Sequence, residues 1–264
     1  MPTKRAVRRT TRILVLNPNS SQEMTHTLQQ SIRSMELSSS TEVDAYTAPQ
    51  KSPTSINNGE DVEVSARVVE DDLTKTQLLQ QYDAILVACF SAHPLVGWLA
   101  EQDGEFARLS VMGIFEASIL TALSLIRPGK KWGIVTTGKY WEQHLVEGAK
   151  RFLGTFGDQA KNDRFAGVET TGLNASDFHD GVDPEVVRQA LQNATARLLT
   201  DKDVECVIMG CAGMTGLEKV IRSTAAELCG PEQAADLFVV DGVRAGIGLL
   251  EQMVRNRRAF QRPP

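Results

Sequence analysis

The sequence has no long hydrophobic run and few aromatic residues, which make up only 6% of its 264 positions. A membrane-spanning helix needs about 20 apolar residues in succession, so no membrane segment is expected. No G-x-G-x-x-G or G-x-x-x-x-G-K-S/T loop follows a strand-like stretch, which argues against a dinucleotide or nucleoside triphosphate site. The four histidines and four cysteines form no cluster with metal-ligand spacing. Neither a metal nor another cofactor is therefore expected.

Charge of neither sign dominates the chain. The net charge of −5 gives no general attraction to nucleic acid or to anionic membranes, so neither is expected as a partner. The start is the exception, because five basic residues precede the first acidic residue, Glu23. We interpret residues 1–11 as a disordered basic tail, with a mitochondrial targeting segment as the alternative. A chain with a sizeable core does not need disulfides, so a reducing cytoplasm is the expected compartment.

Hydrophobic segments alternate between strand-like and helix-like patterns along the chain. Strands are expected at residues 12–16, 41–47, 85–88, 111–114, 132–135, 165–169, 204–209 and 237–240. Helices are expected at residues 21–35, 61–81, 93–101, 117–126, 140–152, 183–199, 216–226 and 243–255. Such alternation is typical of an α/β fold in which helices wrap parallel sheets.

A faint internal repeat divides the chain after the basic tail into two similar parts. Val15 falls on Val135 at an offset of 120 residues (135 − 15), and Cys89 falls on Cys211 at an offset of 122 (211 − 89). We therefore expect two pseudo-symmetric α/β halves, at about 12–125 and 130–240, with some exchange of strands or helices between them. Each half would be a parallel sheet flanked by helices, and the active site would lie in the cleft between them.

Two of the strand-like segments end on a cysteine, Cys89 in the first half and Cys211 in the second. Open α/β sheets bind ligands at the carboxyl ends of their strands. A thiolate and a thiol that face one substrate could remove a proton from a carbon next to a carbonyl and return it to the other face. A helix start follows each cysteine, and its N–H groups are expected to lower a thiol pKa of about 8.5 and to hold an enolate oxygen.

Polar side chains at neighbouring strand ends are candidates to orient a polar, planar substrate: Asn17, Ser91, Thr136 and Thr137. Each also has a structural interpretation. Asn17 precedes Pro18 and could merely shape a turn, and the two threonines could form a turn and a helix cap. His93 could polarise Cys89 or simply begin a helix. Glu116 could cap a helix or line the pocket.

The other cysteines and histidines are assigned to the core and the surface. Cys206 and Cys229 are expected to be small core residues. The remaining histidines, His26, His144 and His179, are expected on the surface because no partner pattern accompanies them.

Several strings of this sequence together resemble one protein family. They are Arg12-Ile-Leu-Val-Leu-Asn-Pro-Asn-Ser20, Ala88-Cys-Phe-Ser91, Gly113-Ile-Phe-Glu-Ala117, Gly210-Cys-Ala-Gly-Met214 and Asp241-Gly-Val243. The resemblance is to the aspartate/glutamate/hydantoin racemase superfamily, and within it to the hydantoin and allantoin racemase branch. It covers nearly the whole chain after the basic tail.

The resemblance implies two α/β subdomains with the active site between them, proton transfer without a cofactor, and a homo-oligomer. Cys89 and Cys211 match the family's two catalytic cysteines. The segments that match the ligand cleft contain Asn17, Phe90, Ser91, Thr136, Thr137, Ala212 and Gly213. One departure stands out, because many hydantoin racemases read Gly-Asp-Pro where this chain reads Ser91-Ala-His-Pro94.

The leading hypothesis is a racemase of a cyclic ureide of the hydantoin or allantoin type. The alternatives are a cis–trans isomerase or a decarboxylase of a small dicarboxylate, and an aspartate or glutamate racemase. A protein of another class, a ligand-binding regulator that kept the pocket, would bind without exchanging protons. No arginine or lysine lies at the expected strand ends apart from Lys139, which favours a neutral or singly charged small-molecule substrate.

Overall fold

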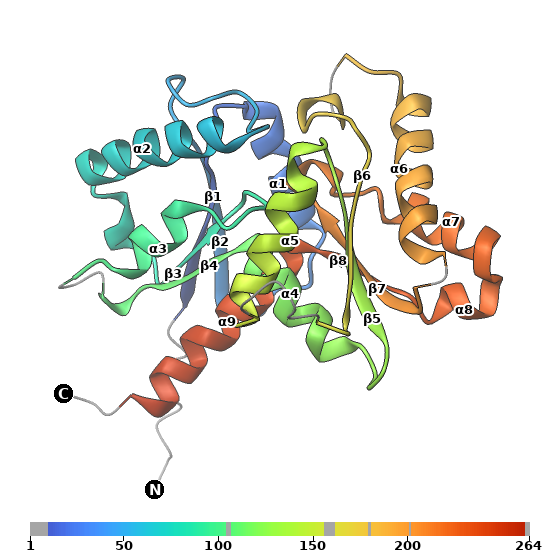
Figure 1. The fold of residues 1–264 in the computed structure, drawn as a ribbon. Coiled ribbons are helices and arrows are strands. Elements are labelled where there is room, and N and C mark those ends of the chain that lie inside the picture. The colour runs from blue at the N-terminus through green and yellow to red at the C-terminus, as the bar shows by residue number, and fades with distance from the viewer. Residues whose placement is uncertain (1–9, 104–106, 156–161, 179–180, 201, 262–264) are drawn as a thin grey trace, which may run out of the picture.

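The computed structural model describes residues 10–103, 107–155, 162–178, 181–200 and 202–261. Two four-stranded sheets, each parallel throughout, form the frame of the molecule (Figure 1). The strands of the first sheet are β1 (Thr11–Asn17), β2 (Thr41–Thr47), β3 (Ala84–Val87) and β4 (Ser110–Gly113). Those of the second sheet are β5 (Lys131–Thr136), β6 (Phe165–Thr170), β7 (Val204–Gly210) and β8 (Phe238–Asp241).

The two sheets have the same topology. The strand order is β2-β1-β3-β4 in the first sheet and β6-β5-β7-β8 in the second. Each strand of the first sheet therefore has a counterpart four strands later in the chain, which confirms the predicted α/β fold with two pseudo-symmetric halves. The first strand begins at Thr11, inside the predicted tail, and residues 1–9 lie outside the described part.

Helices lie on both faces of each sheet. They are α1 (Gln22–Arg33), α2 (Gly59–Thr76), α3 (Pro94–Ala100), α4 (Ile114–Leu125), α5 (Tyr140–Phe152), α6 (Pro184–Leu199), α7 (Glu218–Cys229), α8 (Pro231–Ala235) and α9 (Gly242–Phe260). Short 3-10 turns lie between these elements at Leu78–Gln81, Ser176–Phe178 and Ala212–Met214. The first turns of four helices are capped by a side chain that accepts a hydrogen bond from a backbone N–H of that turn. The capping residues are Ser21 for α1, Asn58 for α2, Asp183 for α6 and Asp241 for α9.

Successive side chains of a buried strand point to opposite faces of its sheet, and the core of the described residues forms three clusters. In β1, Ile13 and Val15 face a central cluster, whereas Leu14 and Leu16 face an outer cluster with α2 and α3. The central cluster also receives Ile134 and Ile208 of the second sheet, together with side chains of α1, α4, α5 and α9. A third cluster joins the outer face of the second sheet to α6 and α7. The inner helices therefore lie between the two sheets (Figure 1).

Helices α4 and α9 cross from one half to the other. Helix α4 follows β4 of the first sheet but contacts β7 and β8 of the second, and α9 follows β8 but contacts β1, β3 and β4. The two helices also contact each other. Close packing of α9 on β3 requires a glycine, because a Cβ at Gly246 would overlap the side chain of Leu86.

Most differences from the predicted elements lie at helix ends. Helix α2 stops at Thr76 instead of continuing to Gln81, because Gln77 adopts a left-handed conformation with φ of 52°. Helix α7 starts two residues later than predicted, after Gly216 with φ of 91°. The short helix α8 was not predicted.

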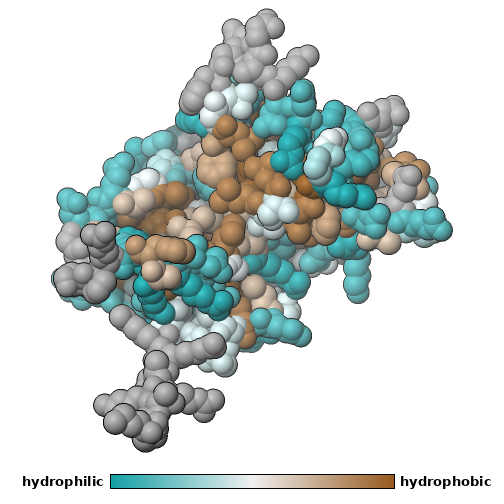
Figure 2. All heavy atoms as spheres, turned by 90° about the horizontal axis from the view of Figure 1, so that it is seen from below, coloured by the Kyte–Doolittle hydropathy of each residue, from teal (hydrophilic) through white to brown (hydrophobic). Residues whose placement is uncertain are grey.

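The lower face of the molecule carries an apolar area in its middle, between hydrophilic borders (Figure 2). Large apolar side chains exposed on the surface include Leu120 and Leu125 of α4 and Phe152 at the end of α5. The predicted assembly into homo-oligomers stays a prediction. Of the helices in the described residues, none combines the length and the apolar character that a membrane span requires.

Candidate active site

A small cavity lies between the halves, at the carboxyl ends of β3 and β7. Its volume is about 40 Å³, which is room for about three water molecules. From the first half it is lined by Pro18, Asn19, Met24, Ile56, Ala88, Cys89 and Phe90. From the second half it is lined by Thr137, Trp141, Ala175, Gly210, Cys211 and Ala212. The structure thus brings the two predicted cysteines, 122 residues apart in sequence, to one cavity.

Cys89 lies two residues beyond β3 and is half-buried. Its sulfur lies 3.6 Å from the hydroxyl oxygen of Ser91. Burial raises the pKa of Cys89 to about 12, and the charge of Cys211 contributes to the increase, while the Ser91 hydroxyl opposes it. The sequence had predicted a lowered pKa. Desolvation of the thiolate outweighs the hydrogen bond here, so Cys89 is a neutral thiol at neutral pH.

Cys211 precedes the 3-10 turn at Ala212–Met214, and its sulfur accepts a hydrogen bond of 3.3 Å from the N–H of Gly213. Burial raises the pKa of Cys211 to about 11, while the backbone N–H groups of Gly213 and Met214 lower it in part. The expected backbone donors are therefore present at this cysteine. Backbone donors of this kind contact Cys211, whereas the Ser91 hydroxyl contacts Cys89.

The structure gives Asn17 a supporting position rather than one on the cavity wall. Its buried amide lies within hydrogen-bond distance of Asn19 Oδ1, the carbonyl of Ser21 and the Thr25 hydroxyl, and its Oδ1 accepts from the Asn19 N–H. These bonds hold the turn after β1, which presents Pro18 and Asn19 to the cavity.

Asn19 is a polar residue of the cavity wall that was not predicted. Its Oδ1 accepts from the amide of Asn17 and from the backbone N–H of Ser21. That arrangement fixes the orientation of the side-chain amide, and its NH₂ group has no hydrogen-bond partner within the described part of the chain.

The two threonines at the end of β5 take different positions. Thr136 is 1% exposed and its hydroxyl donates to the carbonyl of Gly210 at 2.6 Å, so it ties β5 to β7 just before Cys211. Thr137 lines the cavity, and within the described residues its hydroxyl has no hydrogen-bond partner. Thr137 and Asn19 therefore offer polar groups from opposite halves.

His93 is held in a structural role at the start of α3. Its Nδ1 accepts from the N–H of Leu95 at 3.3 Å, and its Nε2 lies 3.1 Å from the Ser65 hydroxyl, which donates to the carbonyl of Val62. Burial lowers the pKa of His93 to about 4, so the ring is neutral. His93 is not among the described residues that line the cavity. Of the two roles considered from the sequence, the structure gives it the one at the start of a helix.

Glu116 lies in the first turn of α4, packed against the backbone of Gly113. Its Oε2 is buried without a hydrogen-bond partner among the described residues. Burial raises the pKa of Glu116 to about 7, although the backbone N–H groups of Glu116 and Gly113 lower it in part. Its charge also raises the pKa of Cys89, so this carboxyl influences the cavity without being part of its described lining.

Apolar residues form much of the wall, and the sequence analysis did not single them out for the site. Met24 of α1 and Trp141 of α5 occupy helix positions whose apolar pattern is typical of core residues. Ile56 and Ala175 lie in loops. No local pattern distinguishes such residues, since the cavity forms only when the two halves meet.

Comparison with known proteins finds matches along nearly the whole chain. The model of the Asp/Glu/Hydantoin racemase family matches residues 13–250. Protein DCG1 of Saccharomyces cerevisiae is 31% identical over 250 residues, which cover 93% of this chain and 97% of that protein. A hydantoin racemase of a Pseudomonas species is 27% identical over 243 residues, or 92% of this chain and 86% of that protein.

Solved structures with a similar fold include an allantoin racemase from Pseudomonas fluorescens. It superimposes with a TM-score of 0.74 and 26% sequence identity, covering 93% of this chain and 91% of that chain. A glutamate racemase from Bacillus anthracis has a TM-score of 0.62 and 17% identity, a likeness of fold alone.

Proposed function

This chain belongs to the aspartate/glutamate/hydantoin racemase family, and from that premise we propose that it racemises a cyclic ureide of the hydantoin or allantoin type. Cys89 and Cys211 are the proposed acid and base. The observation that carries the proposal is that both thiols line one cavity whose described lining contains no charged side chain. The hydantoin racemase and allantoin racemase among the similar proteins support the same substrate class.

In the proposed reaction, a thiolate on one side of the ring removes the proton from the carbon next to the carbonyl. The C–H electron pair moves into the ring, and an enolate forms with its charge on the carbonyl oxygen. The thiol on the other side then gives its proton to the opposite face of the same carbon. The reaction ends with the two cysteines in exchanged protonation states. Before the next turnover in this direction, the cysteine that took the proton must release it to solvent, and the other cysteine must take one up from solvent.

The hydrogen-bond donors around the two thiols indicate which cysteine carries the negative charge. Burial raises both values, to about 12 for Cys89 and about 11 for Cys211. The N–H groups of Gly213 and Met214 favour a thiolate at Cys211. We therefore assign Cys211 the negative charge of the active resting form, with Cys89 as the thiol.

Two polar groups of the cavity suit a ureide ring. The NH₂ group of Asn19 can donate to a ring carbonyl, and the Thr137 hydroxyl can donate to a carbonyl or accept from a ring N–H. The cavity is small, about 40 Å³, and partly open to solvent. Apolar side chains such as Met24, Ile56 and Trp141 would surround the substituent.

The same lining argues against the dicarboxylate alternatives. A substrate with two carboxylates needs cationic or dense hydrogen-bonding partners, because an unpaired buried charge is strongly unfavourable. Neither arginine nor lysine occurs among the described residues of the cavity wall. A neutral ring meets no such penalty.

The test is to incubate the full chain with S-allantoin or an L-5-substituted hydantoin in D₂O, with a blank without enzyme. We expect optical rotation to decay together with loss of the α-proton NMR signal. Aspartate, glutamate and maleate complete the panel. Turnover of those acids without activity on either ureide would overturn the proposed substrate class, and no activity on any compound would favour a binding protein.

Single-cysteine variants test the mechanism separately. Cys89→Ser and Cys211→Ser should each lower racemisation by about 10²- to 10⁴-fold. Each variant should still exchange the α-proton of one enantiomer, because the remaining cysteine removes and returns a proton on a single face. The two variants should act on opposite enantiomers. Cys229→Ser, at an exposed position, is the control, and full racemisation by either cavity variant would refute the two-thiol mechanism.

A further inference from the structure

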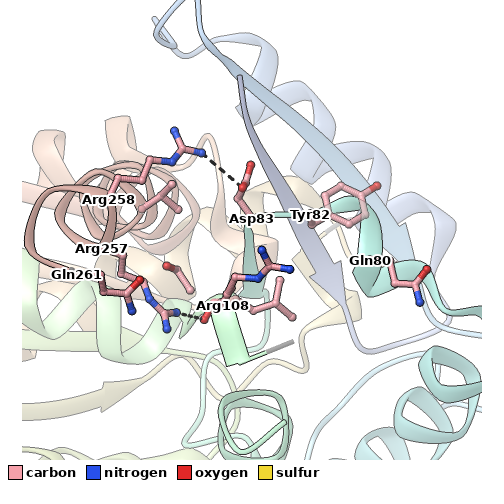
Figure 3. A pocket seen from close by; sticks show the side chains of 10 residues that line it. Gln80, Tyr82, Asp83, Arg108, Arg257, Arg258 and Gln261 are labelled. Atoms are coloured by element: carbon pink, nitrogen blue, oxygen red, sulfur yellow. Dashed lines mark hydrogen bonds and ion pairs between the residues drawn. The ribbon is translucent and has the colours of Figure 1, made fainter. Parts of the chain in front are cut away.

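A second hollow lies at the opposite end of the first sheet from the thiol cavity (Figure 3). Its volume is about 220 Å³. Asp83, immediately before β3, and Ser110, the first residue of β4, contribute to its wall, whereas Cys89 follows the other end of β3. The last turn of α9 forms another side. This hollow is therefore separate from the proposed active site.

Positive charge predominates in the hollow, where three arginines and one aspartate line the wall. Arg258 lies 3.4 Å from Asp83. Arg257 donates to the backbone carbonyls of Ala107 and Leu109, which orient its guanidinium without neutralising it (Figure 3). Arg108 is exposed and forms no ion pair within the described residues. Among the described side chains of the wall, the positive charges therefore exceed the negative charges by two.

A buried hydroxyl adds an unused hydrogen-bonding group to the same wall. Ser110 is only 1% exposed, and its Oγ has no hydrogen-bond partner among the described residues. Buried hydroxyls are normally paired. A ligand with acceptor oxygens in the hollow would satisfy Ser110 and the arginines together.

The second half provides an internal comparison. A hollow of about 240 Å³ lies at the corresponding end of the second sheet. There Glu205 accepts from the backbone N–H and the guanidinium of Arg127, and Lys130 lies 2.5 Å from Asp203. The repeat architecture therefore produces a hollow at both places. Among the described residues of the second-half hollow, Arg127 and Lys130 are each paired with a carboxylate, whereas those of the first-half hollow include one carboxylate for three arginines. The excess of arginine is a property of the first half and not of the fold.

We propose that the first-half hollow binds a small divalent oxyanion, inorganic phosphate or a short dicarboxylate. Its two negative charges match the excess positive charge of the wall. Arg108 and Arg257 would supply charge-assisted hydrogen bonds, and the Ser110 hydroxyl would donate to a third oxygen. The occupant would link the last turn of α9 to the start of β4.

The test is isothermal titration of the full chain with inorganic phosphate and, separately, with succinate at low ionic strength and pH 7.5. One saturable site with a Kd in the millimolar range or tighter is expected for at least one anion. The preference between the two anions distinguishes a phosphate site from a dicarboxylate site. Absence of saturation with both at about 20 mM would overturn the proposal.

Variants locate the anion. Arg108→Ala should weaken binding about tenfold and Ser110→Ala about threefold, as expected for loss of a charged and a neutral hydrogen bond. Arg255→Ala removes the same charge from an exposed position of α9 outside the hollow, and it should change the affinity less than twofold. Equal weakening by Arg255→Ala and Arg108→Ala would show a general charge effect and refute the site.

The proposal is independent of the racemase chemistry. The double variant Cys89→Ser/Cys211→Ser should bind the anion with unchanged affinity, because the thiols line the other cavity. Loss of binding in that variant would place the anion at the thiols and overturn this site.

Discussion

Replacing Glu116 with glutamine should stabilise the protein above neutral pH. Burial raises the pKa of this carboxyl from 4.5 to about 7. A shift of that size corresponds to about 3 kcal/mol, which is the upper limit of the gain at pH 8. Glutamine keeps the shape of the side chain and an acceptor for the N–H groups at the start of α4, but it removes the buried charge.

The sign of the pH dependence follows from proton binding. Between pH 4.5 and 7 the folded protein keeps the proton on Glu116, whereas the unfolded chain has lost it. Stability therefore falls as the pH rises through this window. The contribution is fully present below pH 4.5 and lost above pH 7, and Glu116→Gln should remove this part of the slope.

Urea denaturation of both proteins at pH 5 and pH 8 measures the effect. The difference in the free energy of unfolding between variant and wild type should be larger at pH 8. Glu23→Gln, in the exposed first turn of α1, should show no such change. An equal difference at both pH values would refute the assigned buried charge. A second readout is alkylation of Cys89, whose pKa should fall once the neighbouring charge is gone.

Three further predictions concern packing, capping and thiol reactivity. Gly246→Ala should lower the free energy of unfolding by about 1–3 kcal/mol, because the added methyl group would overlap Leu86 of β3. Gly248→Ala, on the same helix but facing open space, should raise the free energy of unfolding by about 0.5–1 kcal/mol. Equal effects of the two variants in chemical denaturation would contradict this packing. His93→Ala should lower the free energy of unfolding by about 1–2 kcal/mol through loss of a helix cap. The value of kcat/KM in the racemase assay should stay unchanged, and a large fall in it would contradict the structural role of the ring. At pH 7, iodoacetamide should modify the exposed Cys229 before the two cavity thiols, and mass spectrometry of the peptides would expose a reversed order.

The sheet framework could be predicted because its strands are short, apolar and regularly spaced. The offset that relates Cys89 to Cys211 reflects real equivalence of β3 and β7 in two sheets of identical order. The sequence predicted some exchange of strands or helices between the halves, but it did not identify α4 and α9 as the helices that cross. Each of these helices has apolar residues that would suit either sheet. Which sheet a helix covers depends on the whole core and not on its own pattern.

The site was less predictable where burial competes with hydrogen bonding. Helix starts and backbone donors follow the cysteines, but desolvation reverses the expected direction of the thiol pKa shifts. Asn17 and Asn19 have the same side chain two positions apart, and only their contacts distinguish the supporting residue from the one on the wall. His93 likewise carries a reactive side chain, yet both ring nitrogens have structural partners.

The crossing of α4 and α9 has a consequence for any shortened form of the chain. A fragment that ends after α4 would expose the face of β3 and β4 that α9 covers, and its own last helix would lack the strands it covers. Two copies of such a fragment would cover these surfaces by exchanging α4, so that the helix of each copy packs on β3 and β4 of the other, as in domain-swapped dimers. Because the fragment contains Cys89 but not Cys211, a cavity of such a dimer would hold the Cys89 thiols of two molecules. The 264-residue chain makes this exchange between its own two halves, so the pairing of Cys89 with Cys211 does not depend on protein concentration.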